Sequence, residues 1–114
     1  MRDDPAKVLD IHLACTDVLE ITAGVERAAF NDNRVLQLAL CRLLEVIGEA
    51  ARTVSEEYRL DHPEIPWAGI VGLRHKIVHE YFRLDLDMIW RIVAEDVPPL
   101  ARTIATLIPP REGP

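Results

Sequence analysis

The sequence is poor in the features that mark several large classes of protein. It has two cysteines, Cys15 and Cys41, and neither lies in a CxxC or other metal-ligand spacing, so we expect two buried, reduced thiols. No apolar run approaches the roughly 18 residues needed to span a bilayer, and the first residues, MRDDP, are acidic and polar. These absences predict a cytoplasmic protein that does not use a membrane as a partner.

Positive charge is also scarce. The 114 residues include 13 lysines and arginines against 19 aspartates and glutamates, which gives a net charge of -6. Such a molecule repels nucleic acid as a whole, which excludes a general coat protein for DNA or RNA, and we expect no DNA partner. The balance changes locally, because residues 74–91 hold four lysines and arginines and two histidines against three acids. A phosphate group is therefore expected to bind in this segment.

The sequence does contain apolar residues spaced three and four apart, the pattern of amphipathic helices. This pattern predicts helices at about 4–24, 33–54, 67–81 and 85–107, separated by turn-forming residues. Pro98 and Pro99 must kink or restart the last helix, because neither has an amide hydrogen to donate. With no alternating strand pattern, repeat or Gly-rich phosphate loop, we expect an all-α, antiparallel bundle of four to five helices. Residues 1–108 are expected to form this one domain, and residues 109–114 a disordered tail.

The third predicted helix carries the segment RHKIVHEY, residues 74–81, which allows three interpretations. In the first, Arg74, His75 and His79 simply form the solvated face of the helix. In the second, His75 and His79, spaced i and i+4, bind one metal ion. Two ligands are too few for a metal site, no cysteine cluster supplies a third, and Lys76 adds a repelling charge. We therefore expect no metal and no cofactor.

In the third interpretation, the segment cleaves RNA by acid–base chemistry. Metal-free cleavage needs a base for the 2′-hydroxyl, an acid for the leaving 5′-oxygen, and a fixed cation for the charge that grows on the phosphate. Histidine suits the proton transfers because its pKa lies near neutrality, and the planar guanidinium of arginine binds two phosphate oxygens. Arg74 is expected inside the apolar stripe of the helix, in line with Ile70 and Ile77, where a lone charge is costly.

Arg74 and His79 do not meet on a straight helix, because their spacing of five residues turns them about 140° apart. They come together only if the helix ends or distorts near His79, or if two copies of the chain face each other across a symmetric dimer. The dimer would also gather enough positive charge to hold RNA. Tyr81 falls about 20° from Arg74 around the helix and about two turns along, so we expect its hydroxyl at the border of the same cleft.

The segment also resembles the R-x-x-x-x-H-x-Y signature of HEPN ribonucleases, with His75 at a position that is typically Asn, Asp or His. Further stretches resemble the minimal HEPN toxins of the HepT type, namely EVIGEA at 45–50, PEIPW at 63–67, GLR at 72–74 and IW at 89–90. The resemblance runs from the first residues to Leu107. It implies a helical bundle that forms a homodimer, with a metal-independent RNase site at the dimer cleft. By position, Arg74 would bind phosphate, His79 would be the principal acid and base, and His75 a polar helper.

The resemblance also implies a partner protein. Such toxins are usually paired with an MNT-type minimal nucleotidyltransferase that acts as antitoxin, and in some pairs it transfers AMP to the tyrosine of the H-x-Y motif, here Tyr81. Glu45 and Glu49 lie one turn apart on the central helix, and one of them can hold Arg74 in place, or both can face solvent. The first hypothesis is an RNase toxin that binds RNA, a second copy of itself and the nucleotidyltransferase. The alternative is a non-catalytic helical dimer that docks the nucleotidyltransferase.

Overall fold

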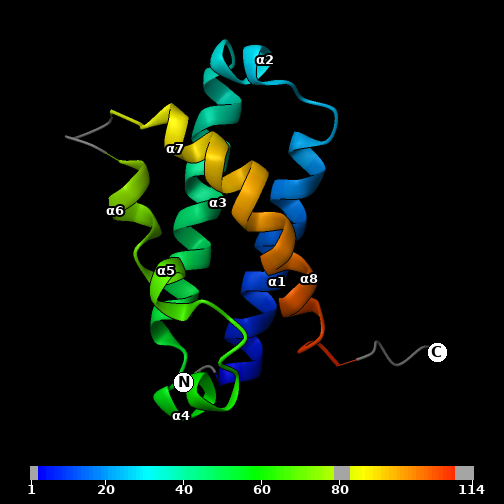
Figure 1. The fold of residues 1–114 in the computed structure, drawn as a ribbon, viewed down its shortest axis with the longest axis vertical. Coiled ribbons are helices and arrows are strands. Elements are labelled where there is room, and N and C mark those ends of the chain that lie inside the picture. The colour runs from blue at the N-terminus through cyan, green and yellow to red at the C-terminus, as the bar shows by residue number, and fades with distance from the viewer. Residues whose placement is uncertain (1–2, 79–82, 110–114) are drawn as a thin grey trace.

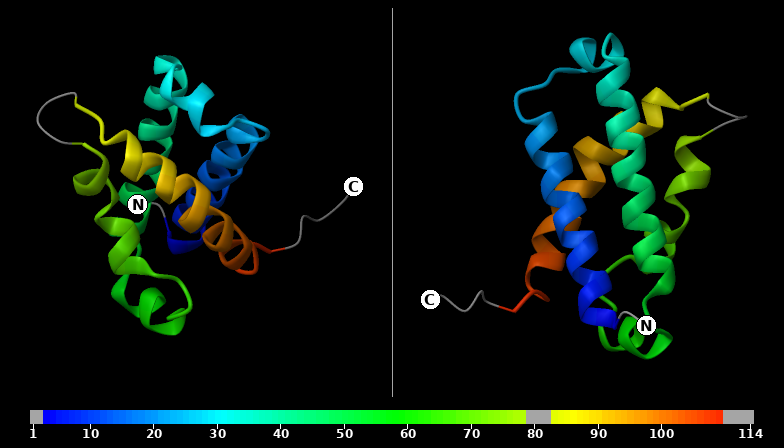
Figure 2. Two further views of the ribbon diagram at one scale, coloured as in Figure 1. Left: turned by 45° about the horizontal axis from the view of Figure 1, so that its top comes forward. Right: turned by 180° about the vertical axis from the view of Figure 1, so that it is seen from behind.

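The computed structural model describes residues 3–78 and 83–109. Two long helices, α1 (Asp4–Thr22) and α3 (Arg34–Thr53), run antiparallel and side by side (Figures 1 and 2). The other helices, in chain order, are α2 (Arg27–Asn31), α4 (Glu56–Asp61), α5 (Trp67–Val71), α6 (Leu73–Ile77), α7 (Leu86–Arg91), the π-helix η1 (Ile92–Asp96) and α8 (Val97–Ala105). Within the described ranges, none of these helices is both long and apolar enough to cross a membrane.

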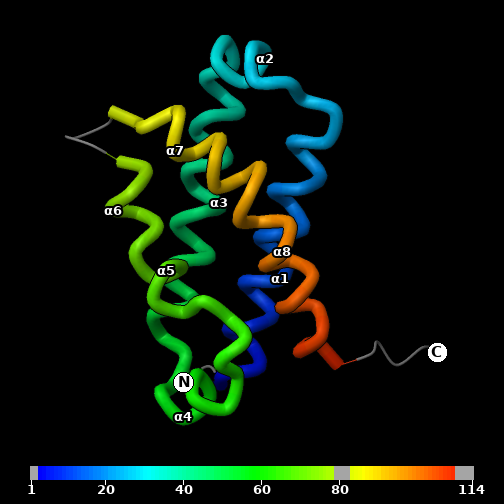
Figure 3. Tube along the Cα trace, in the orientation of Figure 1, coloured from blue at the N-terminus to red at the C-terminus, as the bar shows by residue number. Residues whose placement is uncertain are grey.

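The all-α prediction is confirmed, with four long helical runs and two short helices that the apolar pattern did not predict. The four runs are α1, α3, the pair α5–α6, and the continuous path from α7 through η1 to α8, which Figure 3 traces. The two short helices, α2 and α4, cover the opposite ends of the α1–α3 pair. The symmetric homodimer stays a prediction. The predicted disordered tail lies outside the described residues from 110 onward.

Helix α1 begins where an acid and a proline stand together. The carboxylate of Asp3 caps the helix by accepting from the amide of Ala6 at 3.0 Å, and Pro5 occupies the first turn, where no amide donor is needed. Asp4, in the first turn of the helix, accepts from the amide and the hydroxyl of Ser55 at 2.9 and 2.6 Å. The start of α1 is thereby tied to the start of α4.

Helix α3 is the centre of the fold. It is capped by Asn33, whose side chain accepts from the amide of Leu36 at 3.0 Å, and it packs against α1, α5 and α6. Gly48 lies where α5 comes closest, because a Cβ at this position would stand 3.0 Å from the carbonyl oxygen of Ile70. Cys15 and Cys41 are buried free thiols, as predicted, and belong to the same continuous core.

The third predicted helix, expected over residues 67–81, is broken and shorter. It consists of α5 and α6 with a turn at Gly72, and α6 ends at Ile77 because Val78 is extended, with φ -115° and ψ 121°. Val78 pairs with Leu84 in an isolated antiparallel bridge. Next to this bridge, the amide of Asp85 donates a backbone hydrogen bond of 2.8 Å to the carbonyl of Ile77. The helical part that precedes His79 is therefore only five residues long.

The fourth run restarts at Val97, as the two prolines require. The amide of Val97 donates to the carbonyl of Ile92, five residues back, so one wide π-helical turn precedes Pro98 and Pro99. The prolines then stand in the first turn of α8, where helical amides have no intrahelical acceptor. This run crosses the α1–α3 pair on the face that Figure 1 presents.

Candidate functional site

The exposed surface of α6 carries three consecutive side chains suited to binding or cleaving a phosphodiester. Arg74, His75 and Lys76 are all exposed, while Leu73 and Ile77, four residues apart, are buried against the core. The prediction that Arg74 lies inside the apolar stripe is wrong. The buried residues Ile70, Leu73 and Ile77, spaced three and four apart, form the apolar stripe, and Arg74 stands beside it on the exposed side.

His79 and Tyr81 lie outside the described residues. The point at which α6 ends decides whether Arg74 and His79 belong to one straight helix. Of the two ways in which Arg74 and His79 could approach each other, the first, a helix that ends before His79, is confirmed by the extended backbone of Val78. The separation of about 140° applies only to a straight helix, so it no longer keeps the two side chains of one chain apart. A second copy is therefore not required by helix geometry alone.

Helix α3 forms the neighbouring wall of the site. The thiol of Cys41 donates to Glu45 Oε1 at 3.3 Å, and Arg42 Nη1 lies 3.9 Å from Glu45 Oε2. Burial raises the pKa of the Cys41 thiol to about 11, the hydrogen bond and charge of Glu45 add to this, and the guanidinium groups of Arg74 and Arg34 oppose it. Arg74 and Arg34 thus both lie near the same stretch of α3. A thiol with so high a pKa is not a nucleophile at neutral pH.

The two acids predicted to support Arg74 differ in their surroundings. Glu45 is half-buried beside Cys41, whereas Glu49 is exposed and binds Arg52 with two hydrogen bonds of 3.1 and 2.5 Å. The hydrogen bonds from Arg52 lower the pKa of the Glu49 carboxyl. Among the ion pairs of the described residues, Glu45 pairs with Arg42 and Glu49 with Arg52, and neither pairs with Arg74.

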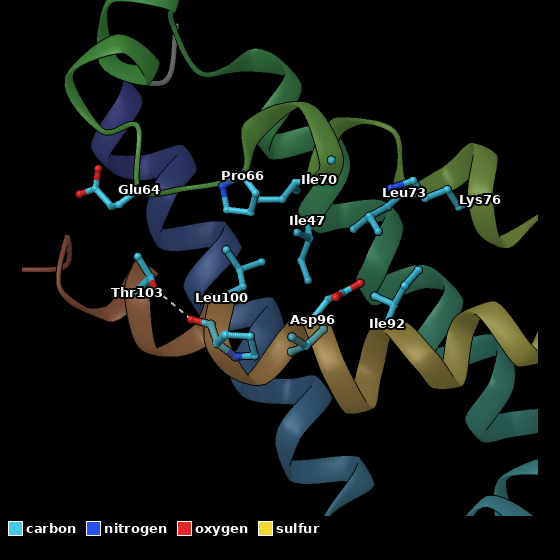
Figure 4. Close-up of a pocket in the computed structure, with 13 residues that line it drawn as sticks. Ile47, Glu64, Pro66, Ile70, Leu73, Lys76, Ile92, Asp96, Leu100 and Thr103 are labelled. Atoms are coloured by element: carbon cyan, nitrogen blue, oxygen red, sulfur yellow. Dashed lines mark hydrogen bonds between the residues drawn. The ribbon is translucent and has the colours of Figure 1, made fainter.

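Sequence reasoning did not predict a groove of about 480 Å³ between α5–α6 and the η1–α8 run. Figure 4 shows its apolar lining, which includes Ile47 and Ile70, with Glu64 at one end and Lys76 at the other. Arg74 is not among the lining residues, so α6 presents two different surfaces. A sequence pattern could not show this groove because it is formed by the gap between two helical runs. In the ranges described, no three His, Cys, Asp or Glu side chains gather as metal ligands.

Comparison with known proteins matches most of the chain. Residues 11–107 match the family described as Ribonuclease HepT-like. A Methanocaldococcus jannaschii protein named "Putative RNase" is 38% identical over 103 residues, covering 90% of this chain and 94% of the relative. A Thermococcus cleftensis protein named "Probable ribonuclease HepT" is 36% identical over 91 residues, covering 80% and 83%.

A third relative, a Caldanaerobacter subterraneus protein also named "Putative RNase", is 33% identical over 94 residues, covering 82% of this chain and 84% of its own length. No solved structure gives a significant match. The family match spans α3, α6 and the residues between α6 and α7, so it includes the whole candidate site. The resemblance to the HepT-type HEPN proteins is therefore confirmed, and this chain belongs to the HepT-like ribonuclease family of HEPN proteins.

Proposed function

We propose that this chain is a metal-independent endoribonuclease toxin whose site consists of Arg74, His75 and His79. The observation that carries the proposal is the surface of α6, where Arg74, His75 and Lys76 are exposed directly before His79 in a chain of net charge -6. Solvated cations on an acidic protein form a local attraction for an RNA backbone. Membership in the HepT-like ribonuclease family supports phosphodiester cleavage as the reaction.

In the proposed reaction, His79 takes the proton of the ribose 2′-hydroxyl, and the 2′-oxygen attacks the adjacent phosphorus. The bond from phosphorus to the 5′-oxygen breaks, and His75, acting as the acid, donates a proton to this oxygen. The products are a 2′,3′-cyclic phosphate and a 5′-hydroxyl, so atoms and protons balance without a further reactant. Arg74 binds two non-bridging oxygens and stabilises the charge of the pentacoordinate state.

The active unit in this proposal is a symmetric homodimer. A second copy would bring another Arg74, His75 and Lys76 to a shared cleft and would double the local positive charge. Because α6 ends at Ile77, the dimer is favoured by this local charge and not by the separation of Arg74 and His79 on a straight helix. Light scattering at the concentration of the activity assay would give the mass of the active species, and a fully active monomer would contradict the dimer.

The cognate inhibitor in this proposal is an MNT-type nucleotidyltransferase that transfers AMP from ATP to the hydroxyl oxygen of Tyr81 and releases pyrophosphate. The added phosphodiester carries a negative charge that Arg74 can bind in place of substrate, while like-charge repulsion excludes RNA. The antitoxin would then inactivate the toxin by a covalent modification two residues after His79 in the sequence.

The test is incubation of the purified protein with a defined RNA in the presence of EDTA. We expect cleavage with 2′,3′-cyclic phosphate ends, and a loss of about 10²-fold or more in rate for Arg74→Ala, as for other groups that stabilise transition-state charge. Arg102→Ala on α8 is the matched control, because Arg102 is also an exposed arginine and lies in another helix. Cleavage that EDTA abolishes and a divalent ion restores would contradict the proposal, as would an unchanged rate in Arg74→Ala.

A further inference from the structure

Most lysines and arginines in the described ranges have a partner that explains them within the fold. The partnered cations are Lys7 with the Thr53 carbonyl, Arg27 with Asp87, Arg42 with Glu45, Arg52 with Glu49, Arg59 with the Ala51 and Arg52 carbonyls, and Arg91 with Glu95. Among the residues described, the cations without a hydrogen bond or ion pair are Arg34, Arg74, Lys76, Arg83 and Arg102. All of these side chains are exposed.

Arg102 and Arg34 differ in what the fold gains from them. Arg102 stands in the last turn of α8, where a cation interacts favourably with the negative end of the helix dipole. Arg34 is the first residue of the 20-residue helix α3, where the dipole disfavours a cation, and it has no acidic partner in the described structure. Arg34 is therefore a cost to the stability of α3, and the fold does not account for its charge.

Arg34 lies on the face of α3 that carries Cys41, next to α6. Residues 34 and 41 are seven apart on α3, so they lie within about 20° on one face and about 10 Å apart along the axis. Cys41 is the residue on that face whose thiol senses both guanidinium groups, that of Arg34 from α3 and that of Arg74 from α6. Helix α6 lies beside α3 in both views of the fold (Figures 1 and 2). The two unpaired arginines thus both lie near Cys41, one on α3 and one on the neighbouring α6.

We propose that Arg34 is a second phosphate-binding residue, which holds an RNA backbone phosphate next to the scissile phosphate that Arg74 holds. The inference rests on the proposed function and extends its site from α6 across to the start of α3. A single-stranded RNA needs cations spaced along its backbone, and an acidic protein can supply them only where arginines are free of acids. The guanidinium of Arg34 can bind a phosphate by two parallel hydrogen bonds. It positions substrate and takes no part in proton transfer.

The test is salt-dependent binding of a 2′-O-methyl RNA oligonucleotide, which lacks the 2′-hydroxyl and so cannot be cleaved by the proposed reaction. Arg34→Gln is expected to bind roughly tenfold more weakly than wild type. It should also lower the slope of log K against log salt by about 0.7, the value for one phosphate contact on a single strand. Arg34→Lys should keep the slope, and Arg102→Gln should keep both slope and affinity. Because Arg34 opposes the helix dipole, Arg34→Gln should unfold at the same temperature as wild type or slightly higher.

Three results would overturn the inference. They are an Arg34→Gln protein with the affinity and slope of wild type, an equal loss in Arg102→Gln, or a change of oligomeric mass in Arg34→Gln, which would place Arg34 in a protein interface. Its failure differs from failure of the proposed function. A wild-type protein that cleaves RNA while Arg34→Gln binds normally removes only the role of Arg34, whereas a wild-type protein that neither binds nor cleaves RNA removes both.

Discussion

The closest packing between the site-bearing helices and the core is at Gly48, and adding one methyl group there tests how that packing positions α6. In Gly48→Ala the new Cβ would stand 3.0 Å from the carbonyl oxygen of Ile70 and 3.8 Å from Leu73 Cβ. The nearer atom belongs to the backbone, so it cannot rotate away as the end of a side chain could. Helix α5 must therefore move away from α3, and α6 must move with it.

The change in the free energy of unfolding of Gly48→Ala follows from two opposing effects. Overfilling a packed contact costs about 1–3 kcal/mol, whereas replacing glycine by alanine inside a helix gains about 1 kcal/mol. Because the contact is with backbone, we expect the upper part of the first range and a net loss of about 1–2 kcal/mol in the free energy of unfolding. Urea unfolding would measure it, provided that the m-value stays constant.

Gly69→Ala is the matched control, because Gly69 lies in α5 and a Cβ there would meet nothing within 4 Å. This variant should gain about 0.5–1 kcal/mol from helix propensity alone. Gly48→Ala should also reduce RNA cleavage by displacing α6, and Gly69→Ala should not. Equal stabilisation by both substitutions would refute the reasoning that the approach of α5 requires glycine at position 48.

Further predictions concern the contact between Asp4 and Ser55, the two thiols and Tyr81. Hydrogen bonds from Ser55 lower the pKa of Asp4 below its ordinary 3.8. Their contribution to the free energy of unfolding is therefore complete above pH 3.8 and is lost as the pH falls through the lowered pKa. Ser55→Ala should make the free energy of unfolding depend less on acid pH, and the same pH dependence in wild type and variant would argue against this. Burial raises the pKa of Cys15 to about 12 and that of Cys41 to about 11, so iodoacetamide at pH 8 should label neither thiol before unfolding, and rapid labelling of the native protein would exclude such burial. Co-expression with the nucleotidyltransferase proposed as its partner should add AMP to Tyr81, seen as an increase in intact mass that is absent in Tyr81→Phe; modification elsewhere would rule out this switch.

The long helices could be predicted from the sequence because their apolar spacing is sustained over several turns. The run from α7 to α8 was also predictable, since Pro98 and Pro99 allow only a restart or a kink. Helices α2 and α4, of five and six residues, are too short to show a period, so the pattern did not indicate them. The sequence alone does not decide whether Asp3 or Asp4 caps α1, because both precede Pro5 and only the contact of Asp4 with Ser55 distinguishes them.

The candidate site was predicted in composition and not in geometry. The residue types of the α6 segment pointed to phosphodiester chemistry, and the family match supports that class of reaction. The burial of Arg74 was predicted wrongly because Arg74 lies at the edge of the apolar stripe, where spacing alone does not decide between a buried and an exposed side chain. The partners of Glu45 and Glu49 were not predicted either, because the spacing of residues in the sequence does not show which arginine lies nearest to each acid.

The most direct test of the central claim is the single-turnover rate of cleavage of one defined RNA, in EDTA, by wild type and His79→Gln over a range of pH. The account predicts a rate lower by about 10²-fold or more in His79→Gln, since general acid–base catalysis supplies 10²–10⁴-fold, and the loss of one limb of the pH profile. A His79→Gln protein that cleaves the RNA at the wild-type rate with the wild-type pH profile would contradict the account.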